Sequence, residues 1–98
     1  MLRHFVICPI AATCTPEQFD DVVTQLRSLQ AHIPGIPSFS VEKSKGLSNE
    51  RPGFVLMAEF NTEADWHAYM QNEHHLAIGE AITPFLDVEH MVMTQTDL

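Results

Sequence analysis

The sequence has few of the features that mark disordered, fibrous or membrane-spanning chains. Only 4 of its 98 residues are Gly and 6 are Pro, and the absence of any low-complexity run excludes a fibrous repeat. The longest hydrophobic run, residues 5–12, is interrupted by Pro9 and falls far short of the roughly 20 residues that cross a bilayer. Because 45% of the residues are hydrophobic, we expect residues 1–98 to form one folded domain with a single core and no membrane partner.

Basic residues are also scarce, with 5 Lys and Arg against 13 Asp and Glu and a net charge of −8. Such a chain repels phosphate groups, so nucleic acid is not an expected partner. Residues 2–12 are too short and interrupted for a secretory signal. Cys8 and Cys14 match neither a metal knuckle nor a redox CxxC motif. These features favour a cytoplasmic protein with reduced thiols.

Hydrophobic spacing predicts alternating strands and helices. A strand is expected at residues 2–10, with His4, Val6 and Cys8 on one face. The other predicted elements are a helix from 16 to 33, strands at 36–42 and 54–60, helical segments from 63 to 71 and from about 74 to 85, and a strand at 88–96. Thr15 and Gln18 have the pattern of a capping box, and Thr62 precedes the second helical region as an N-cap.

The order β-α-β-β-α-β is typical of a ferredoxin-like fold of the α+β class. We therefore predict a four-stranded antiparallel sheet with the helices on one face. The strands are apolar on both faces, as at Met91, Val92 and Met93, and the helices can cover only one of them. We expect a homodimer that buries sheet face against sheet face.

Three polar side chains are candidates for a site beside the core. His75 lies on one helical stripe with Ile78, Gly79 and Ile82, and Gly79 leaves space because helical side chains lean toward the N-terminus. Tyr69 is on the inner face of its helix, and His4 is added if its strand face looks toward the helices. A His near neutral pKa with a Tyr donor suits proton abstraction next to a carbonyl.

The same residues also fit a purely structural interpretation, in which a buried Tyr and a His bonded to backbone belong to the core. Trp66 is most simply a core residue in that interpretation. Adjacent His74 and His75 cannot both face one metal, so no metal is expected. No Gly-rich phosphate loop or nucleophile elbow is present, so no cofactor is expected.

Four segments resemble the stress-responsive dimeric α/β-barrel (Dabb) family in their order and spacing. They are Arg3-His4-Phe5-Val6, residues 31–36, residues 53–56 and residues 69–78. The resemblance covers essentially the whole chain. It implies a ferredoxin-like protomer, a homodimeric α/β barrel in which the sheets meet, and a ligand cavity between sheet and helices in each subunit.

A plant polyketide cyclase of that family works without a cofactor and uses a Tyr and a His. Tyr69 and His75 match these two residues, and His4 matches its first-strand His. The resemblance thus implies a catalytic set of His75, Tyr69 and His4. The predicted substrate-binding residues are Leu56, Gly79, Ile82 and Trp66. Two departures imply a different substrate: residues 72–75 lack the family's first His and Pro, and Leu56 replaces a pocket His.

Three functions follow as alternatives. The first is a cofactor-independent cyclase, lyase or isomerase in which His75 is the base and Tyr69 the hydrogen-bond donor to a small carbonyl or polyketide-like compound. The second is a non-catalytic, stress-related dimer that binds a small hydrophobic ligand or is purely structural. The third is a cofactor-free monooxygenase-like enzyme, which rests on fold analogy alone.

Overall fold

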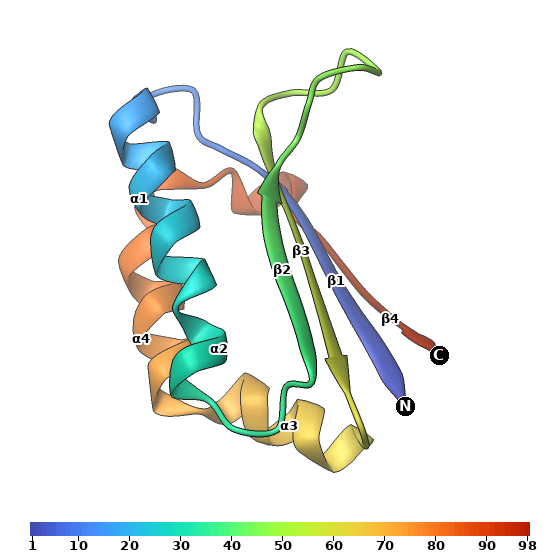
Figure 1. Ribbon diagram of the computed structural model, residues 1–98. Helices are drawn as coiled ribbons and strands as arrows, with labels where there is room; N and C mark the ends of the chain where they lie inside the picture. The colour runs from blue at the N-terminus through green and yellow to red at the C-terminus, as the bar shows by residue number, and fades with distance from the viewer.

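The computed structural model describes residues 1–98 and contains one sheet covered by helices on one side (Figure 1). The antiparallel strands lie in the order β2-β3-β1-β4, as a ferredoxin-like fold requires. The elements are β1 (Leu2–Pro9), α1 (Pro16–Arg27), α2 (Leu29–His32), β2 (Ser38–Lys43), β3 (Gly53–Phe60), α3 (Glu63–Gln71), α4 (Glu73–Ile82), η1 (Thr83–Phe85), η2 (Val88–His90) and β4 (Val92–Asp97). None of the helices is long and apolar enough to cross a membrane.

Local capping signals in the sequence set where the helices begin. The Thr15 side chain accepts from the backbone N–H of Gln18, and the Gln18 side chain accepts from the backbone N–H of Thr15, which confirms the capping box. Thr62 likewise accepts from the backbone N–H of Asp65 at the start of α3. These contacts satisfy N–H groups that have no partner within the helix.

The first helical region is broken, whereas a continuous helix to residue 33 was predicted. α1 ends at Arg27 and the four-residue α2 follows. At the break, the Ser28 hydroxyl donates to the Gln25 carbonyl oxygen at 2.6 Å, a side-chain contact that competes with the helical backbone pattern. Leu29 and Ile33 remain buried, so the predicted apolar stripe survives the break.

The last strand begins later than predicted, at Val92 instead of residue 88. Residues Val88–His90 form a 3-10 turn instead. Asp87 holds this turn, because its carboxylate contacts His90 Nδ1 at 2.8 Å and Arg51 at 2.7 Å while its backbone N–H donates to the Pro9 carbonyl oxygen. The predicted helical pattern up to residue 85 similarly ends at Ile82 and continues as the short turn η1.

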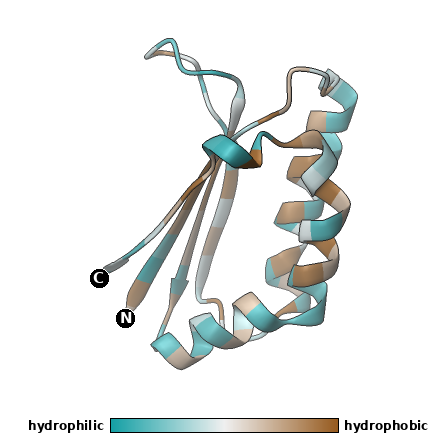
Figure 2. Cartoon of the chain, turned by 180° about the vertical axis from the view of Figure 1, so that it is seen from behind, coloured by the Kyte–Doolittle hydropathy of each residue, from teal (hydrophilic) through white to brown (hydrophobic).

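The core lies between one sheet face and the helices. Alternate residues of the two central strands point into it: Leu2, His4, Val6 and Cys8 from β1, and Phe54, Leu56, Ala58 and Phe60 from β3. Hydrophobic residues recur along the helices and central strands, whereas the loop between β2 and β3 is largely hydrophilic (Figure 2). Apart from the hydroxyl of Tyr69, the only strongly polar side-chain group among the buried residues is the imidazole of His4.

The opposite face of the sheet carries no helix (Figure 1). The strand register places Ile7 beside Val55 of β3 and beside Val92 of β4. Their exposed fractions are 51%, 36% and 56%, respectively. These three side chains form an apolar row across three strands, which we call the outer row.

Candidate functional site: a largely apolar cavity with a tyrosine and two histidines

A cavity of about 170 Å³ lies on the helix-covered side of the sheet. Its polar lining includes His4 from β1, Tyr69 from α3 and His75 from α4. The other lining residues are Val6, Leu26, Phe54, Leu56, Gly79, Ile82, Thr83, Leu86, Val88, Met91 and Met93. The site is thus apolar with a few convergent polar groups, which is the usual composition of a small-molecule site.

Tyr69 and His75 are brought together by the break between α3 and α4. Asn72 ends α3, and its side chain accepts from the backbone N–H of His74 at 2.8 Å to begin α4. The two rings lie 4.5 Å apart, centroid to centroid. Tyr69 is buried, and burial raises the pKa of its hydroxyl. The hydroxyl therefore keeps its proton at neutral pH and can donate it in a hydrogen bond.

His75 is partly buried and lacks a hydrogen-bond partner at Nδ1. Burial lowers the pKa of His75. The nearby backbone of Met70 favours the protonated ring and so offsets part of that shift. Even so, Nδ1 of His75 has no hydrogen-bond partner of good geometry. A buried polar atom without a partner is uncommon in a folded protein. His75 is consequently neutral at pH 7 and has the form that a general base requires.

His4 is almost fully buried, with 1% exposure. Its Nδ1 accepts from the Trp66 indole Nε1–H at 3.2 Å and contacts Gln95 Nε2 at 3.0 Å. Burial, with a further contribution from nearby His75, lowers its pKa to about 4. His4 is therefore neutral at pH 7, and its ring lies 6.0 Å from that of Tyr69.

Gly79, Leu56 and Ile82 line the apolar part of the same cavity. A Cβ added at Gly79 would meet no heavy atom within 4 Å, so the missing side chain leaves open space, as the sequence predicted. Leu56 stands on β3 and Ile82 at the end of α4, and both are buried. Leu56 and Ile82 thus form part of the hydrophobic wall of the cavity.

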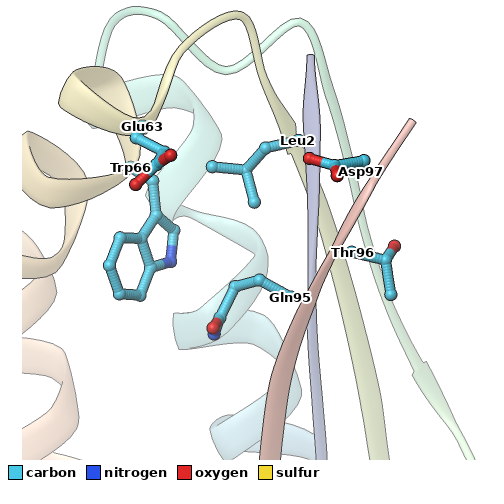
Figure 3. A pocket seen from close by; sticks show the side chains of 6 residues that line it. All are labelled: Leu2, Glu63, Trp66, Gln95, Thr96 and Asp97. Atoms are coloured by element: carbon cyan, nitrogen blue, oxygen red, sulfur yellow. The ribbon is translucent and has the colours of Figure 1, made fainter.

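Trp66 is the one predicted site residue that the structure does not place in the cavity. It lines a separate groove of about 220 Å³ together with Leu2, Glu63, Gln95, Thr96 and Asp97 (Figure 3). From there its indole contacts His4. Because Trp66 does not line the cavity, its connection to the cavity runs through its hydrogen bond to His4.

Sequence reasoning missed Gln95 and the cavity role of Met91 and Met93. Alternation along the last strand puts these three residues on one face, which was a usable signal. The information that was lacking is the pairing register, which sets Gln95 opposite His4 and Met93 opposite Val6. Met91 and Met93 therefore line the cavity.

One group of side chains has the composition of a metal site but lies at the surface. Ligand atoms of Asp87, Glu89 and His90 lie within 4.8 Å of one another. The Asp87 carboxylate already pairs with Arg51 and His90, and Glu89 and His90 are exposed. We assign no metal to this group.

Comparison with known proteins places the chain among dimeric ferredoxin-like folds. Residues 2–95 match the family described as Stress responsive A/B Barrel Domain, or Dabb. A dimeric ferredoxin-like protein of unknown function from Thermobifida fusca superimposes with a TM-score of 0.87 and 29% identity, covering 99% of this chain and 90% of that one. No curated protein matches the chain.

Two similar structures are those of named enzymes. A hydroxynitrile lyase from Passiflora edulis has a TM-score of 0.83 and 16% identity, covering 99% of this chain and 92% of that one. An antibiotic biosynthesis monooxygenase has a TM-score of 0.77 and 18% identity, covering 100% and 98%, respectively. At these identities the likeness establishes the fold alone.

Proposed function

Because the chain belongs to the stress responsive A/B barrel domain family, we propose that it is a homodimeric small-molecule-binding protein that catalyses cofactor-independent acid–base chemistry on a small carbonyl compound. The observation that carries this proposal is the meeting of His4, Tyr69 and His75 in one largely apolar cavity. A neutral imidazole and two proton donors are a suitable set for moving a proton next to a carbonyl group.

In the proposed mechanism, the imidazole of His75 removes a proton from the carbon next to the carbonyl. The electron pair of the broken C–H bond moves to the carbonyl oxygen and forms an enolate. The Tyr69 hydroxyl, and the His4 ring nitrogen opposite Nδ1, donate hydrogen bonds to that oxygen. The enolate then attacks an internal carbonyl in a cyclase, eliminates a group in a lyase, or is reprotonated elsewhere in an isomerase, and the protonated His75 returns the proton.

The cavity volume limits the substrate. An engineered protein cavity of roughly 150 Å³ accommodates benzene, and the cavity here measures about 170 Å³. A ligand with a single ring, or a chain of similar bulk, fits this space. Its body would be apolar, because ten of the lining residues are hydrophobic, and its oxygen would lie at the end formed by His4 and Tyr69.

The proposed homodimer joins two copies through the outer row, Ile7, Val55 and Val92. An apolar row on an otherwise uncovered sheet face is a typical interaction surface. A second copy is the favoured occupant because similar structures, including those from Thermobifida fusca and Bacteroides fragilis, are described as dimeric. Such packing would leave the cavity of each subunit on the helix side of its own sheet.

The proposal can be tested without knowledge of the natural substrate. Cyclohexanone is small enough for the cavity, and proton abstraction next to its carbonyl in D2O replaces hydrogen by deuterium, which NMR detects. We expect the protein to accelerate this exchange and His75→Gln to slow it by about 10² to 10⁴-fold. His74→Gln is the matched control, because His74 is the exposed neighbour and does not line the cavity.

An exchange rate that is the same in His75→Gln and the unaltered protein would remove His75 from the role of base. Cyclohexanone binding without any accelerated exchange would favour the non-catalytic binding dimer. In that case His75→Leu should raise the free energy of unfolding without weakening ligand binding, because it removes an unsatisfied buried polar atom.

A further inference from the structure

His4 is held by two hydrogen-bond donors that lie outside the cavity. Trp66 Nε1 and Gln95 Nε2 lie 3.2 Å and 3.0 Å from the same atom, Nδ1 of His4. Both donors line the groove instead of the cavity. Figure 3 shows Trp66 and Gln95 extending toward each other from α3 and β4, with Thr96 on the other side of β4.

The Trp66 contact fixes which nitrogen of His4 carries the proton. An indole N–H can only donate, so Nδ1 of His4 must be the acceptor. An amide oxygen would be repelled by the same lone pair, so Gln95 presents its NH2 group. A neutral imidazole with a bare Nδ1 carries its proton on Nε2. His4 is thereby a hydrogen-bond donor at Nε2.

Trp66 and Gln95 could both find hydrogen-bond partners without His4. Trp66 is only partly buried, and every residue of β4, including Gln95, is exposed. Water in the groove could satisfy both groups. Two carboxylates, Glu63 and Asp97, line the same groove, yet the neutral donors are the groups that reach Nδ1. A carboxylate at that position would accept a hydrogen bond and draw the proton to Nδ1 instead.

We propose that Trp66 and Gln95 are positioning residues that keep His4 in its Nε2–H tautomer, so that the ring offers the cavity a proton donor and selects ligands with an oxygen acceptor. This inference rests on the proposed function of the cavity as a carbonyl-binding site. Fixing the tautomer through the second ring nitrogen is a general means of setting what a His can do. With His75 as acceptor and Tyr69 and His4 as donors, the site is complementary to an enolate.

The direct test is ¹⁵N NMR of the His4 ring in the full chain at neutral pH, which reports protonation of each nitrogen. We expect a bare Nδ1 and a protonated Nε2 in the unaltered protein. In Gln95→Glu the proton should move to Nδ1, and cyclohexanone exchange should fall by roughly 10²-fold, as when one oxyanion donor is removed. Gln71→Glu adds the same charge at an exposed position of α3. This control should change neither the His4 tautomer nor the exchange rate.

Trp66→Phe keeps an aromatic ring but removes the N–H group, and it serves as a second variant if Gln95→Glu does not fold. We expect its His4 to show a mixture of the two tautomers. A protonated Nδ1 in the unaltered protein would overturn the inference, as would an unchanged tautomer in both variants. Because NMR reads the tautomer without turnover, failure of the inference is distinguishable from failure of the proposed function, which depends on the exchange rate in His75→Gln.

Discussion

The rings of Tyr69 and His75 lie 4.5 Å apart although they belong to two different helices. In one straight helix, residues six positions apart would point to different sides. The break at Asn72 changes the direction of the chain between them, and Asn72 also caps the second helix. The closeness of the two proposed catalytic side chains therefore depends on the break between α3 and α4 at Asn72.

This relationship predicts the effect of removing the cap. Asn72→Ala should lower the free energy of unfolding by about 1 kcal/mol, because the His74 backbone N–H loses its acceptor. Cyclohexanone exchange should fall as well, since α4 then holds His75 less firmly. Urea unfolding measures the first effect. Asn72→Ser retains a capping oxygen and should keep most of the stability and most of the exchange rate. A Ser variant as impaired as the Ala variant would contradict the capping role.

The open space beside Gly79 predicts that a small added side chain stabilises the fold, whereas a large one blocks ligand binding. Gly79→Ala should raise the free energy of unfolding by about 1 kcal/mol, because Ala is the better helix former and its Cβ meets nothing within 4 Å. Gly79→Leu should fill the cavity and abolish cyclohexanone binding. Gly46→Ala is the opposite control, since Gly46 has a φ of +76° that costs an L-residue about 1 kcal/mol. Equal binding by Gly79→Leu would show that ligands do not use this cavity.

The buried histidines predict that stability falls in mild acid. A His has a pKa near 6.5 in an unfolded chain, whereas burial lowers that of His4 to about 4 and lowers that of His75. Between these values the unfolded chain binds protons that the folded chain does not. The stabilisation is complete above about pH 6.5 and is lost as the pH falls toward about 4.

The shift of His4 corresponds to about 3 kcal/mol, from 1.36 kcal/mol per pKa unit. Urea unfolding between about pH 7.5 and 5 measures most of it, because Glu50, whose pKa is lowered to about 2 in the folded chain, adds to the pH dependence only once its carboxylate protonates in the unfolded chain, near pH 4.5. His4→Gln should make the pH dependence shallower by one proton. A variant with the slope of the unaltered protein would mean that His4 is not the group responsible.

The outer row predicts the oligomeric state. At micromolar concentration the protein should sediment with twice the mass of one chain. Ile7→Lys should yield monomers, because it places a charge between Val55 and Val92, where desolvation would be costly. Leu47→Lys is the control, since Leu47 is exposed in the loop between β2 and β3. A monomeric unaltered protein would exclude the proposed interface.

The sequence predicted the features that depend on near neighbours. Thr15 and Thr62 act on residues three positions away, so their helix starts could be recognised directly. Simple periodicity put His4, Val6 and Cys8 together on one face of β1 and left space at Gly79, but it did not decide whether that face of β1 looks toward the helices. Six of the seven predicted site residues consequently line one cavity.

The errors concern contacts between distant parts of the chain. The late start of β4 depends on Asp87 meeting Arg51 and Pro9, and none of these contacts leaves a local pattern. The position of Trp66 follows from its hydrogen bond to His4, 62 positions away. Ser28 is the exception, because its contact with Gln25 is local, but Ser is also tolerated inside helices and does not by itself predict a break.

The contact between His4 and Gln95 spans 91 positions, nearly the whole chain. Contacts of such long separation require the largest loop to close and form late or slowly during folding. During synthesis, β1 and the helices can begin to associate early, but His4 gains its Gln95 donor only after β4 has emerged from the ribosome. A nascent chain that is still held there lacks both the Gln95 donor to His4 and the part of the cavity wall that Met93 of β4 provides.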